Sequence, residues 1–276
     1  GVRDAINFAQ SKVAEHPITV MGELVHNTSV LNDLKKRGVR FKDKPEQVET
    51  KSAMITAHGA SNRTRNRAKA VGLQVSDATC PLVHYAHKQI LELTAIGYHP
   101  IIIGRLGHVE VRGLTEDLSE CDVVLCKDEI NALITKPRFG VVAQTTQPIA
   151  RVRALVQHLK SGFPNSEVRF IDTVCKPTKQ RQSAAEKLAR KSDVVLVVGG
   201  INSNNTHELT RTCRRFCERV HHVQGPDEIL AEWLFDTDTI GITAGTSTPD
   251  RPPVFRRHIH PRRPLLHNQR FATCTY

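Results

Sequence analysis

The chain of 276 residues predicts an α/β protein with largely parallel sheets, on three observations. Short β runs alternate with amphipathic helices, an alternation typical of parallel sheets joined by helices. Polar residues follow each β run, where a strand would end. One local design that contains a cysteine occurs twice, which indicates an internal repeat.

The β runs are apolar stretches bounded by turn residues. They lie at 18–21, 53–56, 100–103, 140–143, 194–198 and 240–243. Helices are predicted at 2–13 and 81–96, and after Thr28, Asn62, Gln147, Lys179, Asn205 and Pro226. Because a helix in an α/β protein normally follows a strand, the helix that opens this chain leads us to expect an N-terminal truncation before Gly1.

Composition excludes several classes of protein. Hydrophobic residues make up 39% of the chain and charged residues 24%, as in soluble globular proteins. No apolar run approaches the roughly 20 residues of a membrane span. Seven irregularly spaced cysteines do not predict a disulfide framework in a chain of this length. They favour a reducing, cytoplasmic location.

Residues 251–276 form a basic tail rich in Pro, Arg and His. Its six arginines account for more than half of the formal net charge of +11, and it contains no Asp or Glu. No helical or strand period is sustained there, so we predict a disordered tail. Few aromatic residues are interleaved with its arginines, so nucleic-acid binding is not favoured.

The polar residues that follow the β runs predict an anion site. In open α/β sheets, ligands bind outside the carboxyl ends of the strands. The candidate donors there are His26, His58, His108, Ser203, Asn204, Asn205 and Ser247. Imidazoles, hydroxyls and amides can all donate to phosphate oxygens, so the set suits a diphosphate. Taken singly, each has the alternative of a turn residue or helix cap.

Cys80 and Cys175 occupy the repeated design: a β run, an aspartate, two residues, a cysteine, and a proline within two residues. Two thiolates brought together would suit a soft metal or an iron–sulfur cluster. The alternative is a pair of buried structural cysteines. Cys213 and Cys217, four residues apart on a helical segment, are predicted to be core residues.

His108 and Glu110 would share one face if their segment were extended. A neighbouring histidine and glutamate form a plausible proton-delivery pair. The alternative is an exposed edge. The zinc deaminases also use H-x-E, but their P-C-x-x-C partner is absent from this sequence.

Several motifs together resemble the LytB/IspH family, the 4-hydroxy-3-methylbut-2-enyl diphosphate reductases of the non-mevalonate isoprenoid pathway. The matching stretches are ELVHN, TAHGAS, DATCPLV, GHVEVRG, AQTTQ, DTVCKPTKQRQ, VGGINSNNTHEL and GITAGTSTPD. They run in order as far as Asp250, which covers nearly the whole chain outside the tail.

The resemblance implies three small α/β domains about a pseudo-threefold axis, with the active site at the centre. We expect domains at 1–78, 79–173 and 174–250, followed by the tail at 251–276. It also implies a [4Fe–4S] cluster held by three cysteines. Cys80 and Cys175 match two of them, and the third is expected just upstream of Gly1. A chain with two ligands is expected not to hold an intact cluster.

The resemblance also assigns roles to residues. Glu110 is the implied proton source, with His108 and Thr145 beside it. His26, His58, His108, Ser203, Asn204, Asn205 and Ser247 are the implied diphosphate ligands. The implied products are isopentenyl and dimethylallyl diphosphate, with electrons from a ferredoxin or flavodoxin type of partner. A cluster-free protein that binds a phosphate ligand is the alternative function.

Overall fold

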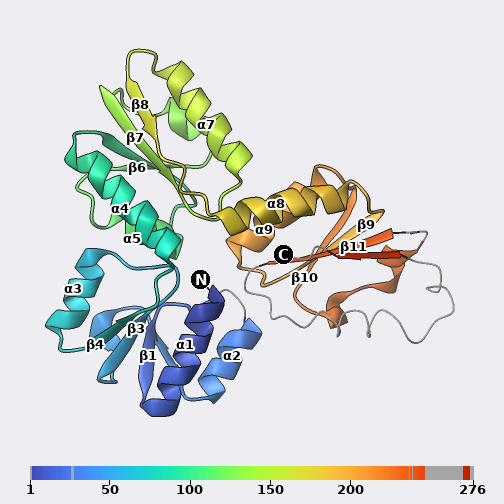
Figure 1. The fold of residues 1–276 in the computed structure, drawn as a ribbon, viewed down its shortest axis with the longest axis horizontal. Helices are drawn as coiled ribbons and strands as arrows, with labels where there is room; N and C mark the ends of the chain where they lie inside the picture. The colour runs from blue at the N-terminus through green and yellow to red at the C-terminus, as the bar shows by residue number, and fades with distance from the viewer. Residues whose placement is uncertain (1, 26–27, 236, 238, 246–269, 274–276) are drawn as a thin grey trace. The chain divides into compact units, whose positions relative to one another are not determined.

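The structure is a computed structural model that describes residues 2–25, 28–235, 237, 239–245 and 270–273 (Figure 1). The chain divides into two compact units. One comprises Gly1–Leu24 with Ser29–Cys175, and the other comprises Val25–Thr28 with Lys176–Tyr276. Each unit is described by itself.

The first sheet has four parallel strands in the order β2-β1-β3-β4. Its strands are β1 (Ile18–Met21), β2 (Arg40–Lys42), β3 (Ser52–Ile55) and β4 (Gln74–Asp77). The accompanying helices are α1 (Val2–Glu15), α2 (Thr28–Lys36), the short 3-10 helix η1 (Pro45–Gln47) and α3 (Asn62–Ala70). Every residue of the two central strands is buried, whereas the edge strands β2 and β4 are partly exposed.

The second sheet repeats this order as β6-β5-β7-β8 and belongs to the same unit. Its strands are β5 (His99–Ile103), β6 (Asp122–Val124), β7 (Arg138–Ala143) and β8 (Glu167–Phe170). Its helices are α4 (Pro81–Ala95), α5 (Val109–Thr115), α6 (Lys127–Asn131) and α7 (Ile149–Gly162).

Alternation along the central strands of the second sheet builds a core on each of its faces. Ile101 and Ile103 of β5 pack with the cluster that includes α7, whereas Ile102 between them packs with the cluster that includes α4 and α5. Successive strand residues point to opposite faces, so one apolar run serves both layers. Figure 1 shows α4 and α5 on one side of these strands and α7 on the other.

The third sheet, in the second unit, has the order β10-β9-β11-β12. Its strands are β9 (Val194–Val198), β10 (Arg219–Val223), β11 (Thr239–Ala244) and β12 (Arg270–Thr273). Its helices are α8 (Lys176–Ala189) and α9 (Asn204–Arg214), with the 3-10 helices η2 (Pro226–Glu228) and η3 (Ala231–Leu234). Cys213 and Cys217 lie in its core, as predicted, although α9 ends before Cys217.

The predicted α/β class with parallel sheets is confirmed, because all three sheets are parallel and share one strand order. All six predicted β runs are strands. The sequence analysis did not predict β2 or β10, whose charged and histidine residues hide the apolar pattern. The predicted domain boundaries stay a prediction.

Two predictions about the C-terminal part are wrong. Residues 270–273 were predicted to be disordered, but they form β12, which pairs in parallel with β11. Phe and Thr favour strands, and the outer edge of β11 offers backbone groups to pair with. The segment after Pro226 was predicted to be a regular helix and instead forms only η2 and η3. Residues 251–269 and 274–276 lie outside the described part of the chain.

No helix within the described residues is long and apolar enough to cross a membrane.

Candidate functional site

Glu110 is the most deeply buried acid of the predicted site. It lies in the first turn of α5, and only 2% of its surface is exposed. Its carboxylate accepts hydrogen bonds from the Thr145 backbone N–H (2.7 Å) and from Thr145 Oγ1 (3.0 Å). Burial raises the pKa of Glu110 to about 7, although the two hydrogen bonds from Thr145 act to lower it. A carboxyl with this pKa can hold and release a proton at neutral pH.

His108 is the N-cap of α5, so the premise of an extended His108–Glu110 segment is wrong. The His108 Nδ1 accepts a hydrogen bond from the backbone N–H of Glu110 at 3.1 Å. An accepting Nδ1 places the proton of a neutral imidazole on Nε2. The pair is therefore joined through a helix cap instead of sharing the face of a strand.

His58 lies beside His108. It comes from the segment after β3, and the two imidazole rings meet edge to face with centroids 5.7 Å apart. The strand ends of the first and second sheets therefore bring together two of the three predicted histidines. The third, His26, lies outside the described residues.

The segment that carries Thr145 is held by amide side chains. Gln144 and Gln147 are fully buried. Gln144 Oε1 accepts from the Arg105 backbone N–H at 3.0 Å and from Gln147 Nε2 at 3.0 Å. These bonds join the segment after β7 to the segment that leads from β5 to His108. Both glutamines belong to the AQTTQ stretch that carries the family resemblance, and no role was predicted for either one.

Cys80 and Cys175 occupy equivalent places. Each follows an edge strand and directly precedes a helix, α4 or α8. The Cys80 N–H donates to the Ala57 carbonyl and the Cys175 N–H to the Thr145 carbonyl, both at 3.0 Å. Ala57 and Thr145 are themselves equivalent, because each lies two residues beyond the strand beside that edge strand. The repeated design seen in the sequence is thus a repeated local structure.

These contacts connect both cysteines to the buried acid within one unit. Cys80 is bonded to the residue before His58, and Cys175 is bonded to the residue that holds Glu110. Neither cysteine forms a disulfide with a described residue, and both are partly exposed. Among the described residues, no group of three or more His, Cys, Asp or Glu side chains is arranged to hold a metal ion.

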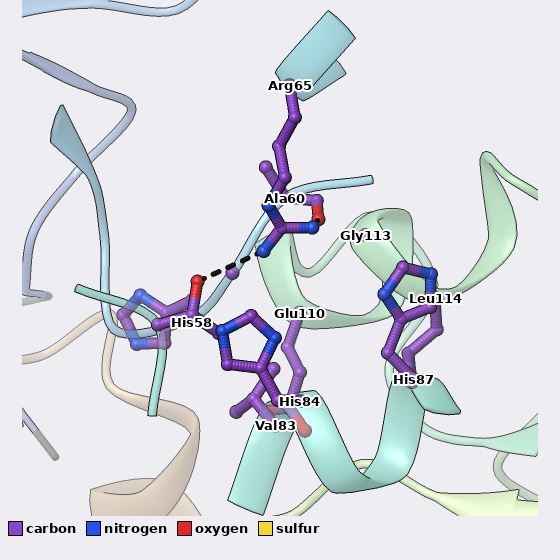
Figure 2. Close-up of a pocket in the computed structure, with 11 residues that line it drawn as sticks. His58, Ala60, Arg65, Val83, His84, His87, Glu110, Gly113 and Leu114 are labelled. Atoms are coloured by element: carbon purple, nitrogen blue, oxygen red, sulfur yellow. Dashed lines mark hydrogen bonds between the residues drawn. The ribbon is translucent and has the colours of Figure 1, made fainter. Parts of the chain in front are cut away.

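A small cavity lies where the segments of the first and second sheets meet. Figure 2 shows His58, His87 and Glu110 around it, with Arg65 reaching in from α3. The space open to the centre of a water-sized sphere is about 10 Å³, which is room for about one water molecule. Glu110 is therefore almost completely shut off from bulk water.

The second unit contributes a separate cluster of buried polar residues at the start of α9. Ser203 is the N-cap, and its hydroxyl accepts from the Thr206 N–H at 3.3 Å. Asn204 and Asn205 are buried beside it, and Asn205 Nδ2 has no hydrogen-bond partner among the described residues. A helix N-terminus with such donors suits an anion. Ser247 lies outside the described residues.

Two glycines allow this cluster to be compact. A Cβ at Gly199 or at Gly245 would collide with the side chain of Thr206, which is fully buried. The ends of β9 and β11 therefore approach the first turn of α9 more closely than other residues would permit. The sequence analysis missed Thr206, because its position in the pattern resembles an ordinary helix residue.

Comparisons with known proteins point to one family. A family profile described as "LytB protein" matches residues 1–252. A protein of Acinetobacter baumannii named 4-hydroxy-3-methylbut-2-enyl diphosphate reductase is 38% identical over 242 residues, which cover 85% of this chain and 77% of that protein. A protein of the same name from Anaeromyxobacter is 35% identical over 255 residues, covering 91% and 89%.

Two solved structures are also similar. The E-1-hydroxy-2-methyl-but-2-enyl-4-diphosphate reductase from Plasmodium falciparum superposes with a TM-score of 0.89 at 27% identity, covering all of this chain and 88% of that one. A second structure, (E)-4-hydroxy-3-methyl-but-2-enyl diphosphate reductase, described as the terminal enzyme of the non-mevalonate pathway, gives a TM-score of 0.67 at 31% identity, covering 94% of both chains.

Fold and strand-end residues together define a parallel α/β enzyme, and its relatives are oxidoreductases. The chain belongs to the LytB family.

Proposed function

We propose that this chain reduces (E)-4-hydroxy-3-methylbut-2-enyl diphosphate to isopentenyl and dimethylallyl diphosphate. The observation that carries the proposal is the buried Glu110, whose carboxyl has a pKa of about 7 and is held by Thr145. The Thr145 carbonyl in turn accepts a hydrogen bond from the backbone N–H of Cys175. A reductive dehydroxylation needs an acid of this kind, because a hydroxyl leaves far more readily as water.

Glu110 acts as the proton donor in this proposal. Loss of the allylic hydroxyl consumes two electrons and two protons and releases one water. Glu110 gives its proton to the leaving oxygen, and the hydroxyl of Thr145 orients both the carboxyl and the substrate oxygen. Burial supports this role, since excluding bulk water keeps the carboxyl protonated near neutral pH.

The diphosphate is bound by imidazole, hydroxyl and amide donors. His58 and His108 would donate through ring N–H groups, and Ser203, Asn204 and Asn205 would present donors at the N-terminus of α9. The unpartnered Asn205 Nδ2 supports a polar ligand there, because a buried amide without a partner is costly. The roles of His26 and Ser247 remain predictions for residues outside the described part of the chain.

A [4Fe–4S] cluster is the proposed cofactor, with Cys80 and Cys175 as two of its ligands. The donor set fits, because two partly exposed thiols occupy equivalent positions, each directly before a helix. When bound, such a cluster supplies electrons and a Lewis-acidic iron for the substrate oxygen. A ferredoxin or flavodoxin type of donor is the predicted source of electrons.

Anaerobic reconstitution of the chain with iron and sulfide tests the proposal. The substrate is added with a chemical reductant, and products are identified by mass spectrometry. Both C5 diphosphates with about four iron atoms bound per chain would support the reductase. The expectation that two cysteine ligands do not hold an intact cluster predicts incomplete iron uptake instead. If the chain binds inorganic pyrophosphate but takes up no iron and releases no product, the cluster-free phosphate-binding function is supported instead.

A further inference from the structure

Beyond the site itself, α5 is attached to the start of α3 by two carboxylates. Asp117, just past the end of α5, accepts hydrogen bonds from the backbone N–H groups of Asn62 (2.6 Å) and Arg63 (3.0 Å). Glu116 accepts from the hydroxyls of Ser61 (2.6 Å) and Thr64 (3.2 Å). Together with the Ser61 cap on Thr64, these bonds satisfy the N–H groups that open α3.

Asp117 is a buried member of this attachment. Its side chain is only 7% exposed, and His87 Nε2 of α4 lies 2.9 Å from its Oδ2. An anion at a helix N-terminus is favoured by the helix dipole and by the backbone donors that it receives. Asp117 therefore joins three helices: the end of α5, the start of α3 and the middle of α4.

Each of the two segments joined by these carboxylates, the start of α3 and the helix α5, is preceded by or contains a site residue. His58 lies three residues before Ser61, and Glu110 lies six residues before Glu116, which is about 9 Å of helix rise. Between its two ends, α5 packs against the backbone of the segment after His58. A Cβ placed on Gly113 would stand 3.6 Å from the backbone of Ala60. The segment from His58 to Thr64 thus runs along the whole of α5, from His108 to Asp117.

We propose that Asp117 is a positioning residue that sets the separation between His58 and the His108–Glu110 pair. It does so by holding the far end of α5 on the start of α3, so that the edge-to-face contact of the two imidazoles forms at the near end. This inference rests on the proposed function only in taking those residues as the reaction site. The attachment itself stands on the hydrogen bonds.

The test compares Asp117→Asn with Asp122→Asn in the full chain. Asp122 is a matched control, because it also pairs with a histidine (His99 Nε2, 2.7 Å) in the second sheet, but at the amino ends of the strands. Histidine-labelled protein without cluster is examined by NMR for the nuclear Overhauser contact between the His58 and His108 rings. Thermal unfolding shows that each variant is folded.

We expect Asp117→Asn to weaken or abolish the contact between the rings and to shift both sets of imidazole resonances, whereas Asp122→Asn leaves them unchanged. If a folded Asp117→Asn variant keeps the wild-type ring contact, or if Asp122→Asn changes it equally, the proposal is overturned. His87→Phe removes the partner of Asp117 but leaves both backbone hydrogen bonds, so it is expected to give a smaller shift in the same direction.

A kinetic measurement separates this proposal from the proposed function. In reconstituted enzyme, Asp117→Asn should lower kcat by on the order of 10²-fold, the effect of displacing reacting groups by about 1 Å. The control variant should retain kcat. A ring contact that depends on Asp117 in a chain without reductase activity would leave the positioning role standing and remove the function. Full activity in Asp117→Asn would leave the proposed function standing and overturn the positioning role.

Discussion

The two ends of the second sheet treat their buried charges in opposite ways. At the amino ends of the strands, His99 lies 2.7 Å from Asp122 and 3.7 Å from Glu120, so an imidazole meets carboxylates. At the carboxyl ends, the Glu110 carboxylate accepts hydrogen bonds from two neutral groups of Thr145. The end that holds the site keeps a buried acid, and burial raises the pKa of Glu110 to about 7.

The two ends of the sheet differ in whether their acidic groups stabilise the fold. A carboxylate within hydrogen-bond distance of an imidazole contributes to the stability of the sheet. An acid that is desolvated and held by neutral donors costs free energy when ionised, and proteins keep such groups mainly where chemistry uses them. Four experiments test this contrast between the two ends of the sheet.

The largest effect is expected from Glu110→Gln. Glutamine can keep the hydrogen bond from the Thr145 N–H but has no proton to give, so kcat should fall by about 10²- to 10⁴-fold, the usual contribution of a general acid. Steady-state kinetics of the reconstituted enzyme measure this. Glu120→Gln, an exposed change at the other end of the sheet, serves as the control. Equal losses in the two variants would contradict the contrast.

The second effect concerns stability as a function of pH. The pKa of Glu110 is raised from 4.5 to about 7, so between these values the folded state holds a proton that the unfolded state has lost. The free energy of unfolding should therefore fall as the pH rises through this window, by about 3 kcal/mol in total. Urea unfolding of wild type and Glu110→Gln at several pH values should show this difference, which a parallel pH dependence in both proteins would exclude.

Thr145→Val is expected to have an intermediate effect. It removes the hydroxyl bond to Glu110 but keeps the backbone N–H bond and the side-chain volume. Losing a donor to the ionised form raises the pKa of Glu110 further, so the alkaline limb of the pH–rate profile should move to higher pH. We expect kcat to fall by about tenfold, in keeping with one hydrogen bond. A limb that moves to lower pH would count against the assigned geometry.

The smallest effect is expected from Asp122→Asn. Its side chain is 45% exposed, so solvent screens the pair with His99 and the loss should be about 1 kcal/mol of unfolding free energy or less. Chemical denaturation measures the loss, and kcat should stay at the wild-type value. A large drop in kcat would mean that the amino ends of the strands also serve the reaction.

Sequence patterns predicted the central strands and the residues after them well. β1, β3, β5 and β9 are buried apolar runs, and burial is what makes such runs visible. Edge strands such as β2 are short and partly charged, so they carry no such signal. β12 could not be predicted, because its pairing depends on the edge of β11 and not on the composition around it.

The sequence predicted which residues belong to the candidate site, but not how they contact one another. Glu110, His108, Thr145 and His58 were predicted as candidates, and the structure brings them together. Sequence alone did not indicate that His108 caps α5, because the H-x-E spacing fits a strand and a helix start equally. Asp117 and His87 were missed, since 30 residues separate them and nothing local marks either one.

The mobility of Cys80 depends on the edge strand that precedes it. Among the residues that the structure describes, β4 pairs with β3 alone and forms one edge of the first sheet. Backbone amides of an edge strand exchange with solvent deuterium through local opening. Exchange of the amides in the central strands β1 and β3 requires more extensive unfolding. Because Cys80 follows β4 by three residues, each opening loosens the thiol as well. A ligand bound to the Cys80 sulfur would therefore slow deuterium uptake along β4. Hydrogen exchange at this sheet edge would then report whether the cysteine site is occupied.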